Sequence, residues 1–227
     1  FIAVLTTAPR PESYLQETIR SLNTAGIRPA VFAEPGSDTL GVSNVHHNPK
    51  TLGAWFNWKQ SIQYALDSNS DWIISCQDDI SIHPETLKFL DAITPHLPDI
   101  GYLSLYTPTH YCLGSGFRLK APGISQMEIK AAYGACALLF SRKTLLRFTE
   151  TSVWKKWLGV PAKINPIEEF VKREADPTLV KHVDAAIPQA LIQLGLPMFY
   201  INPSLVQHIG YESSLSHGPV HKDLSLN

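Results

Sequence analysis

The chain has 227 residues, of which 44% are hydrophobic, so it is long enough to bury the core of one large domain. Its 19 basic and 20 acidic residues give a formal net charge of −1, so it lacks the overall positive field of a general nucleic-acid binder. The three cysteines are too few and too scattered for a disulfide framework or a CxxC metal site. Cys76 and Cys136 lie in apolar runs, where we expect small core residues rather than reactive thiols.

The sequence gives no membrane signal. No apolar run reaches membrane-spanning length, and no charged-then-apolar leader precedes the first predicted strand. The sequence opens inside that strand, which leaves open a signal or anchor removed from the N-terminus. From the sequence as it stands we expect a cytoplasmic protein without a transmembrane segment, and the pattern leaves its oligomeric state open.

Strand and helix patterns alternate through the first half of the chain. This alternation is typical of an α/β fold with a mostly parallel, doubly wound sheet flanked by helices. The predicted elements are, in order, a strand over 1–5, a helix carrying Leu15, Ile19 and Leu22 and ended by Gly26, a strand over 29–33, a helix over 53–66, a strand over 72–76, a helix over 84–96 and a strand over 100–106.

The second half is less regular. Gly, Pro and Ser make residues 107–130 a predicted loop, and residues 151–177 read as an insert or lid. Between and after these segments the patterns predict a strand over 133–140, a helix over 141–148, a helix over 183–194, a strand over 198–201 and a polar tail over 202–227, of which 211–227 is expected to be flexible. With no internal repeat and no clean linker, we expect a single domain over 1–227.

The most informative motif is WIISCQDDI at 72–80, a buried strand that runs into the adjacent carboxylates of Asp78 and Asp79. Acids at the carboxyl end of a parallel strand lie where open α/β sheets bind ligands. Hard oxygen ligands there suit Mg²⁺ or Mn²⁺ carrying a phosphorylated substrate. The alternative is a strand end closed by solvated acids, with Asp79 serving the next helix.

The order of motifs resembles that of GT-A glycosyltransferases, which are nucleotide-sugar-dependent enzymes on a Rossmann-like sheet, usually with a divalent metal. The resemblance extends from residue 1 to about residue 214. It is carried by TTAPR at 6–10, LGAWFNWK at 52–59, QDDI at 77–80, GACALLF at 134–140, HVD at 182–184 and PSLVQHIG at 203–210.

The resemblance implies a metal site. QDDI is similar to the Glu-Asp-Asp metal motif of inverting N-acetylglucosaminyltransferases, with Gln77 in place of the first acid, which leaves the sugar or ribose contact of that position open. Asp79 would bind Mn²⁺ or Mg²⁺ directly, and Asp78 would contact the ribose or a metal-bound water. His208 would complete the metal shell, although a lone histidine is often a capping or surface residue.

The resemblance also implies a catalytic base. Asp184 lies where inverting relatives carry the acid that takes the acceptor hydroxyl proton. Val183 precedes it where many relatives have a second acid, so the match is partial. The alternative is an ordinary acid in the first turn of a helix, where the dipole favours it. Glu168, Glu169 and Asp176 are the fallback bases.

The remaining candidate contacts belong to the donor. Small residues at Gly134 and Ala135 allow close backbone approach to a sugar, or simply tight strand packing, and Gln77 joins them as a sugar contact. Helix residues Asn57 and Lys59 lie on the nucleotide side by resemblance, and the first strand–helix turn offers groups that hold a base or phosphate. The nucleotide-binding residues are thus expected to be Thr6, Thr7, Arg10, Glu34, Asn57, Lys59 and Asp78.

We therefore expect a metal-dependent glycosyltransferase, of hexosyl- or N-acetylhexosaminyl-transferase type, that moves a sugar from a UDP-sugar to a glycan or other hydroxyl with inversion. Retention is the alternative, because retaining and inverting enzymes share this architecture. One alternative is a nucleotidyltransferase, which would usually show a Gly-rich loop after the first strand. Another is a non-catalytic module that binds nucleotide sugars. The acceptor could also be a modified base in DNA, because several basic residues give the insert a local positive character: Lys155, Lys156, Lys163, Lys172 and Arg173.

Overall fold

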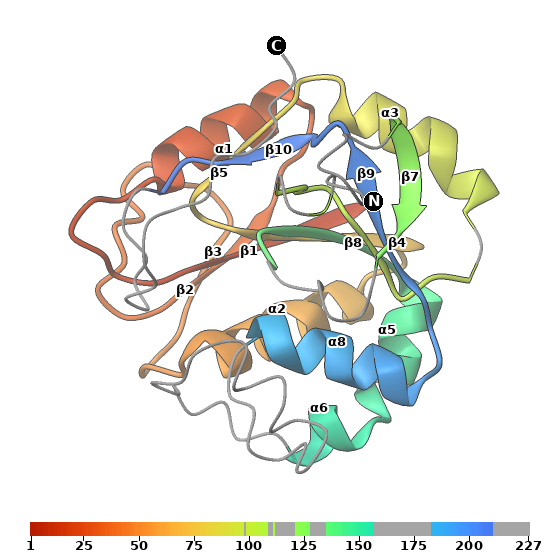
Figure 1. The fold of residues 1–227 in the computed structure, drawn as a ribbon. Helices are drawn as coiled ribbons and strands as arrows, with labels where there is room; N and C mark the ends of the chain where they lie inside the picture. The colour runs from red at the N-terminus through yellow and green to blue at the C-terminus, as the bar shows by residue number, and fades with distance from the viewer. Residues whose placement is uncertain (98, 109–110, 112–120, 128–134, 157–182, 211–227) are drawn as a thin grey trace.

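A mixed β-sheet of eight strands lies at the centre of the computed structural model (Figure 1). The structure describes the chain except for residues 98, 109–110, 112–120, 128–134, 157–182 and 211–227. The strand order is β3-β2-β1-β4-β8-β6-β9-β7. The strands of this sheet are β1 (Ile2–Thr7), β2 (Ala30–Ala33), β3 (Val45–His47), β4 (Trp72–Gln77), β6 (Tyr102–Ser104), β7 (Gly123–Gln126), β8 (Ala137–Ser141) and β9 (Met198–Asn202).

The half of the sheet built from the first four of these strands is parallel. β1 pairs in parallel with β2 and with β4, and β2 pairs in parallel with β3. Helices α1 (Leu15–Thr24) and α2 (Ala54–Asp67) make the crossovers, as the alternating pattern predicted. Strand β8 breaks this pattern, because it runs antiparallel between β4 and β6. The described sheet is thus mostly parallel, with antiparallel pairings at β8 and β7.

Helices cover both faces of the sheet (Figure 1). On one face lie α2 and the later helices α5 (Arg142–Thr149), α6 (Ser152–Lys156) and α8 (Val183–Gln193). On the other face lie α1, α3 (Thr86–Ile93) with its 3-10 turn Thr94–His96, and a ribbon of β5 (Ile80–Ile82) with β10 (Val206–His208). Of the described helices, none combines the length and apolar character needed to span a membrane.

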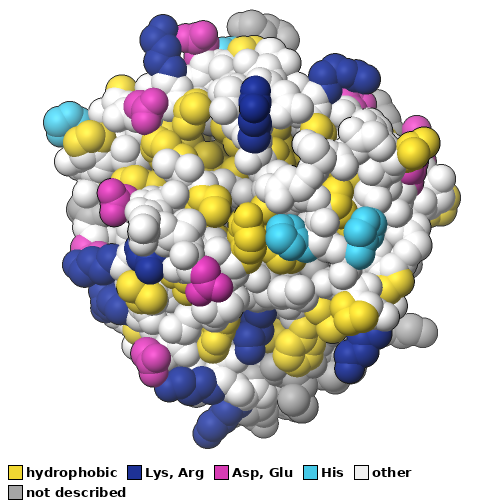
Figure 2. All heavy atoms as spheres, turned by 180° about the vertical axis from the view of Figure 1, so that it is seen from behind, with side chains coloured by type: hydrophobic (Ala, Val, Ile, Leu, Met, Phe, Trp, Pro, Cys, Tyr) yellow, Lys and Arg dark blue, Asp and Glu magenta, His cyan; other side chains and the backbone are white. Residues whose placement is uncertain are grey.

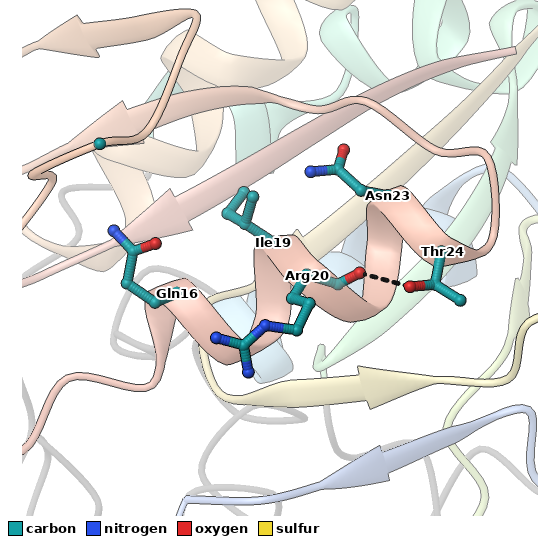
Figure 3. A pocket seen from close by; sticks show the side chains of 6 residues that line it. Gln16, Ile19, Arg20, Asn23 and Thr24 are labelled. Atoms are coloured by element: carbon teal, nitrogen blue, oxygen red, sulfur yellow. Dashed lines mark hydrogen bonds between the residues drawn. The ribbon is translucent and has the colours of Figure 1, made fainter.

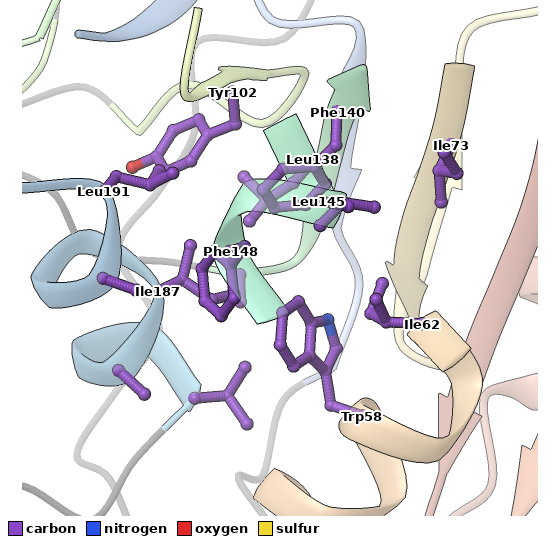
Figure 4. Packing of buried hydrophobic residues seen from close by; sticks show 14 of the residues in the cluster. Trp58, Ile62, Ile73, Tyr102, Leu138, Phe140, Leu145, Phe148, Ile187 and Leu191 are labelled. Carbon is purple, nitrogen blue, oxygen red and sulfur yellow. The ribbon is translucent and has the colours of Figure 1, made fainter. Parts of the chain in front are cut away.

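Alternate strand residues enter two separate cores, because successive side chains of a strand point to opposite faces. Val4, Ile73 and Leu138 join the core under α2, α5 and α8, which Figure 4 shows around Trp58 and Phe148. Their neighbours along each strand join the core under α1 and α3, namely Leu5, Ile74 and Leu139. Burial on both faces explains why these strands read as continuous apolar runs.

Four short strands were missing from the sequence-based prediction. β7 falls in the predicted loop over 107–130 and β10 in the predicted polar tail, while β3 and β5 lie between predicted elements. Each has three or four residues and is held by pairing with a distant segment, so its own sequence carries little signal. The tail prediction was therefore wrong for the residues up to β10, whereas 211–227 lie outside the described residues. So does most of the predicted lid, of which only α6 is described. Cys76 and Cys136 are buried, as expected.

Candidate functional site

The acid pair lies where the two central parallel strands end. β1 and β4 run side by side with Thr6 opposite Gln77, so Thr7 and Asp78 leave the sheet at the same edge. The hydroxyl of Thr7 donates a hydrogen bond to Asp78 Oδ2. Both residues are buried, at 4% and 2% exposure. The structure thus brings the predicted Thr7 and Asp78 together, with half-buried Thr6 beside them in the strand.

Arg10 forms an ion pair with both acids at once. Its Nη2 lies 2.5 Å from Asp78 Oδ1 and its Nη1 lies 2.9 Å from Asp79 Oδ2. The three side chains are 9%, 3% and 9% exposed, so the ion pairs form away from bulk water. We predicted Arg10 as a nucleotide contact, and its contact with the acid pair was not anticipated from the sequence.

His208 reaches the same site from the other end of the chain. β10 pairs antiparallel with β5, which places His208 opposite Ile80. Its Nε2 donates to Asp79 Oδ2 at 3.1 Å, and the Ile209 N–H donates to the Asp79 carbonyl at 2.9 Å. A Cβ added at Gly210 would lie 3.1 Å from Asp79 Oδ2, so a larger residue here would require the acid to shift by a few tenths of an ångström. The expected neighbours Asp79 and His208 are therefore in direct contact.

Thr18, which sequence reasoning missed, supports the turn that carries the acids. This residue is fully buried in α1, and its hydroxyl lies 2.9 Å from the Asp78 carbonyl and 2.8 Å from the Ile80 carbonyl. The same hydroxyl accepts from the Ile80 N–H at 3.1 Å. A polar residue on the apolar face of a predicted helix was the available signal.

The two acids differ in electrostatics. Burial raises the pKa of Asp78 to about 6, against the opposing effect of Arg10. Burial also acts to raise the pKa of Asp79, but hydrogen bonds and charge from His208 and Arg10 outweigh it and leave that pKa below its usual value. Asp79 is therefore the more readily ionised acid, which is the form that binds a metal ion.

The side chains of Asp79 and His208 offer atoms that could bind a divalent cation which also has other ligands. Asp79 Oδ1 is buried and has no hydrogen-bond partner among the described residues. It offers a carboxylate oxygen beside the imidazole of His208, a combination that suits Mn²⁺. Within the described part of the chain, no group of three or more His, Cys, Asp or Glu residues is gathered for a metal. A cation here would need further ligands such as phosphate oxygens and water, as Mg²⁺ commonly does.

Asp184 is joined to this region through the backbone. It lies half-buried in the first turn of α8, and its Oδ1 accepts from the Ala135 N–H at 2.8 Å. The next residue, Cys136, accepts from the Gln77 N–H at 2.9 Å. These two hydrogen bonds connect Asp184, through Ala135 and Cys136, to Gln77, which directly precedes the acid pair. The predicted sugar contact Gly134 lies outside the described residues. Burial, assisted by the Asp184 charge, raises the pKa of the nearby Tyr102.

Glu34 is engaged by the chain itself. It is 3% exposed, and its carboxylate accepts from the Leu52 N–H at 2.9 Å and from the Gly53 N–H at 2.8 Å. These amides precede α2, where a negative charge is favoured by the helix dipole. The nucleotide contact predicted for Glu34 therefore competes with a structural role.

Asn57 and Lys59 also have partners within the protein. Asn57 is buried and donates to the Phe32 carbonyl at 3.1 Å. The Lys59 ammonium donates to the Trp154 carbonyl at 2.7 Å and lies 4.7 Å from the Trp154 ring centroid. The described contacts of Lys59 are thus with α6 and with aromatic rings of its own helix, rather than with the acid pair. Its phosphate contact stays a prediction.

A separate hollow of about 450 Å³ lies along α1 (Figure 3). Its lining residues include none of the predicted site residues: Gln16, Ile19, Arg20, Asn23, Thr24 and Gly41. We do not assign it to the site.

The fold is similar to that of a solved galactosyltransferase. The galactosyltransferase LgtC, solved with donor and acceptor sugar analogues, aligns with a TM-score of 0.50 at 12% identity over 92% of this chain and 86% of that chain. An active-site variant of LgtC aligns with a TM-score of 0.50 at 14% identity over 94% and 89% of the two chains. The inositol-1-phosphate CTP transferase from T. maritima aligns with a TM-score of 0.49 at 15% identity over 91% and 88%.

No protein-family model matches the sequence, and no curated protein matches it. At the identities of the structural matches, the likeness to LgtC establishes the fold alone, which is the expected GT-A, Rossmann-like α/β architecture.

Proposed function

We propose that this protein is a metal-dependent glycosyltransferase that moves a sugar from a nucleotide sugar, most simply a UDP-sugar, to an acceptor hydroxyl with inversion. The observation that carries the proposal is the contact between Asp79 and His208 at the end of β4, within a GT-A fold. Hexosyl and N-acetylhexosaminyl donors are both compatible with it. A glycan is the simplest acceptor.

In this proposal Asp79 and His208 hold Mn²⁺ or Mg²⁺ together with the diphosphate of the donor. Such a cation stabilises the negative charge that develops on the leaving nucleoside diphosphate. Asp78 orients Arg10 through their ion pair, and Thr7 fixes the Asp78 carboxylate. The burial of Thr7 and of the two acids limits access of water and strengthens the charge interactions of Asp78 and Asp79.

Asp184 would act as the base. Its Oδ1 accepts from Ala135, while Oδ2 has no partner among the described residues and is the oxygen proposed to take the proton. The acceptor oxygen would bond to the anomeric carbon as the bond from that carbon to the phosphate oxygen breaks. The hydroxyl proton would pass to Asp184, and the electron pair would leave with the nucleoside diphosphate.

The first test concerns Asp79. We expect UDP to bind in calorimetry with Mn²⁺ and to lose binding in EDTA, and we expect Asp79→Asn to abolish both metal-dependent binding and transfer. Asn keeps the volume of the side chain but removes the charge that a cation requires. An unchanged circular dichroism spectrum would serve as the control for folding. Normal transfer by Asp79→Asn would rule out the proposed metal site.

The second test concerns Asp184. Asp184→Asn keeps an oxygen that can accept from the Ala135 N–H, so the local fold should persist. We expect donor affinity to be kept and kcat to fall by about 10²–10⁴-fold, the usual contribution of a general base. The anomeric configuration of the product, followed by NMR, provides an independent check. Full activity in the variant, or retained configuration in the product, would exclude Asp184 as the base of an inverting displacement.

A further inference from the structure

Arg10 occupies the acid pair in a way that bears on cation binding. One guanidinium nitrogen contacts each carboxylate, at 2.5 Å for Asp78 and 2.9 Å for Asp79. With all three side chains at most 9% exposed, water screens these charges little. The planar fork of an arginine suits this two-point contact, which the single ammonium of a lysine cannot reproduce.

The same ion pair has two buried atoms without hydrogen-bond partners among the described residues. One is an acceptor, Asp79 Oδ1, and the other is a donor, Arg10 Nε. Buried polar groups are seldom left unpaired, because losing their hydration costs free energy. A cation would satisfy the first atom, and an anionic oxygen would satisfy the second.

Arg10 and a cation would also share the carboxylate of Asp79. Asp79 Oδ2 lies 2.9 Å from Arg10 Nη1 and 3.1 Å from His208 Nε2. A divalent ion held between Asp79 and His208 would therefore lie close to the guanidinium, and the two positive charges would repel in this poorly screened setting.

We propose that Arg10 is an internal counter-ion that competes with the divalent cation for Asp79 and is transferred to a phosphate oxygen of the donor when the cation binds. The first half of this statement rests on the proposed cation site, and the second half rests also on the proposed nucleotide-sugar donor. Because Arg10 competes for Asp79, a cation without a nucleotide binds weakly. The diphosphate of the donor removes this competition by forming an ion pair with the guanidinium. The site therefore selects a cation–diphosphate complex over a free cation.

The test measures the dissociation constant of Mn²⁺ alone, by electron paramagnetic resonance, for the wild type and for Arg10→Met. We expect Arg10→Met to bind Mn²⁺ at least about tenfold more tightly, within the usual range of coupling between ligands. Arg20→Met is the matched control, because Arg20 is exposed on the same side of the sheet in α1 and contacts neither acid. Its Mn²⁺ affinity should equal that of the wild type.

A second variant guards against misfolding. Arg10→Met leaves two buried carboxylates without a counter-charge, which is destabilising. Arg10→Met combined with Asp78→Asn removes one positive and one negative charge, so the local net charge stays that of the wild type. The amide introduced by Asp78→Asn would keep an oxygen to accept from the Thr7 hydroxyl. This double variant should also bind Mn²⁺ at least about tenfold more tightly.

Equal Mn²⁺ affinity in the wild type and the double variant would overturn the inference, as would weaker binding in the double variant. Absence of Mn²⁺ binding in every variant would overturn both this inference and the proposed metal site. Tighter Mn²⁺ binding in the double variant, together with no UDP binding by the wild type under any condition, would support the competition and overturn the proposed donor.

Discussion

At the residue scale, the site depends on side chains that hold the acids in place as well as on the acids themselves. Asp78 and Asp79 could be picked from the sequence because they directly follow an apolar strand. Thr18 and the bridging position of Arg10 could not, since each acts through a contact with a segment distant in the chain. The sequence can indicate which residues have suitable side-chain chemistry. Contacts between segments that are distant in the sequence are seen only in the folded structure.

We expect Thr18→Val to lower the free energy of unfolding by about 1–3 kcal/mol, because valine has the shape of threonine but leaves the Ile80 N–H unpaired. Urea unfolding would measure the change. Thr24→Val is the control, since Thr24 is exposed in the same helix and should change stability by less than about 0.5 kcal/mol. Equal effects of the two substitutions would contradict the role given to Thr18.

At the element scale, the long helices and the central strands were predictable because their apolar periodicity is strong. α2, β4 and α8 lie close to their predicted bounds. The antiparallel direction of β8 was not predictable, because a strand buried on both faces reads the same in either direction. β5 and β10 were missed because each is three residues long and depends on pairing with segments far away in the sequence.

The N-terminus of α2 provides a prediction at this scale. We expect Glu34→Gln to destabilise the protein by about 1.5–3 kcal/mol, because charge-assisted bonds to the Leu52 and Gly53 amides are weakened. Thermal unfolding would measure the loss, with exposed Asp38→Asn as the control. UDP affinity should stay unchanged in Glu34→Gln. A loss of UDP affinity without a loss of stability would instead assign Glu34 to the nucleotide.

At the scale of the whole molecule, one sheet separates two cores that share its strands. The fold class was predictable from the alternation of strands and helices, and the structural likeness to LgtC agrees with it. The chain is nearly neutral overall, and on the face seen in Figure 2 the described Lys and Arg side chains are interspersed with Asp and Glu. The basic character predicted for the insert rests mainly on residues outside the described part of the chain.

Because neighbouring residues of each strand belong to different cores, we expect the two cores to unfold together. Leu22→Ala, in the core under α1, should cost about 2–5 kcal/mol. Measured in a Trp72→Phe background, because Trp72 packs against that same core, it should also shift the fluorescence transition of Trp55 and Trp58 in the other core. Circular dichroism and fluorescence should report the same midpoint in urea. A tryptophan transition left in place by Leu22→Ala would indicate that the cores unfold independently.

The pairing of β10 with β5 also determines when the site becomes complete during synthesis. The acids, Arg10 and the strands β1, β2 and β4 leave the ribosome early, whereas His208 emerges after all the strands of the central sheet. A nascent chain can therefore assemble its parallel half-sheet and neutralise its acids with Arg10 while the imidazole is still missing. Because His208 is the last of these residues to be synthesised, the cation site can be completed only after the strands that support it have been synthesised.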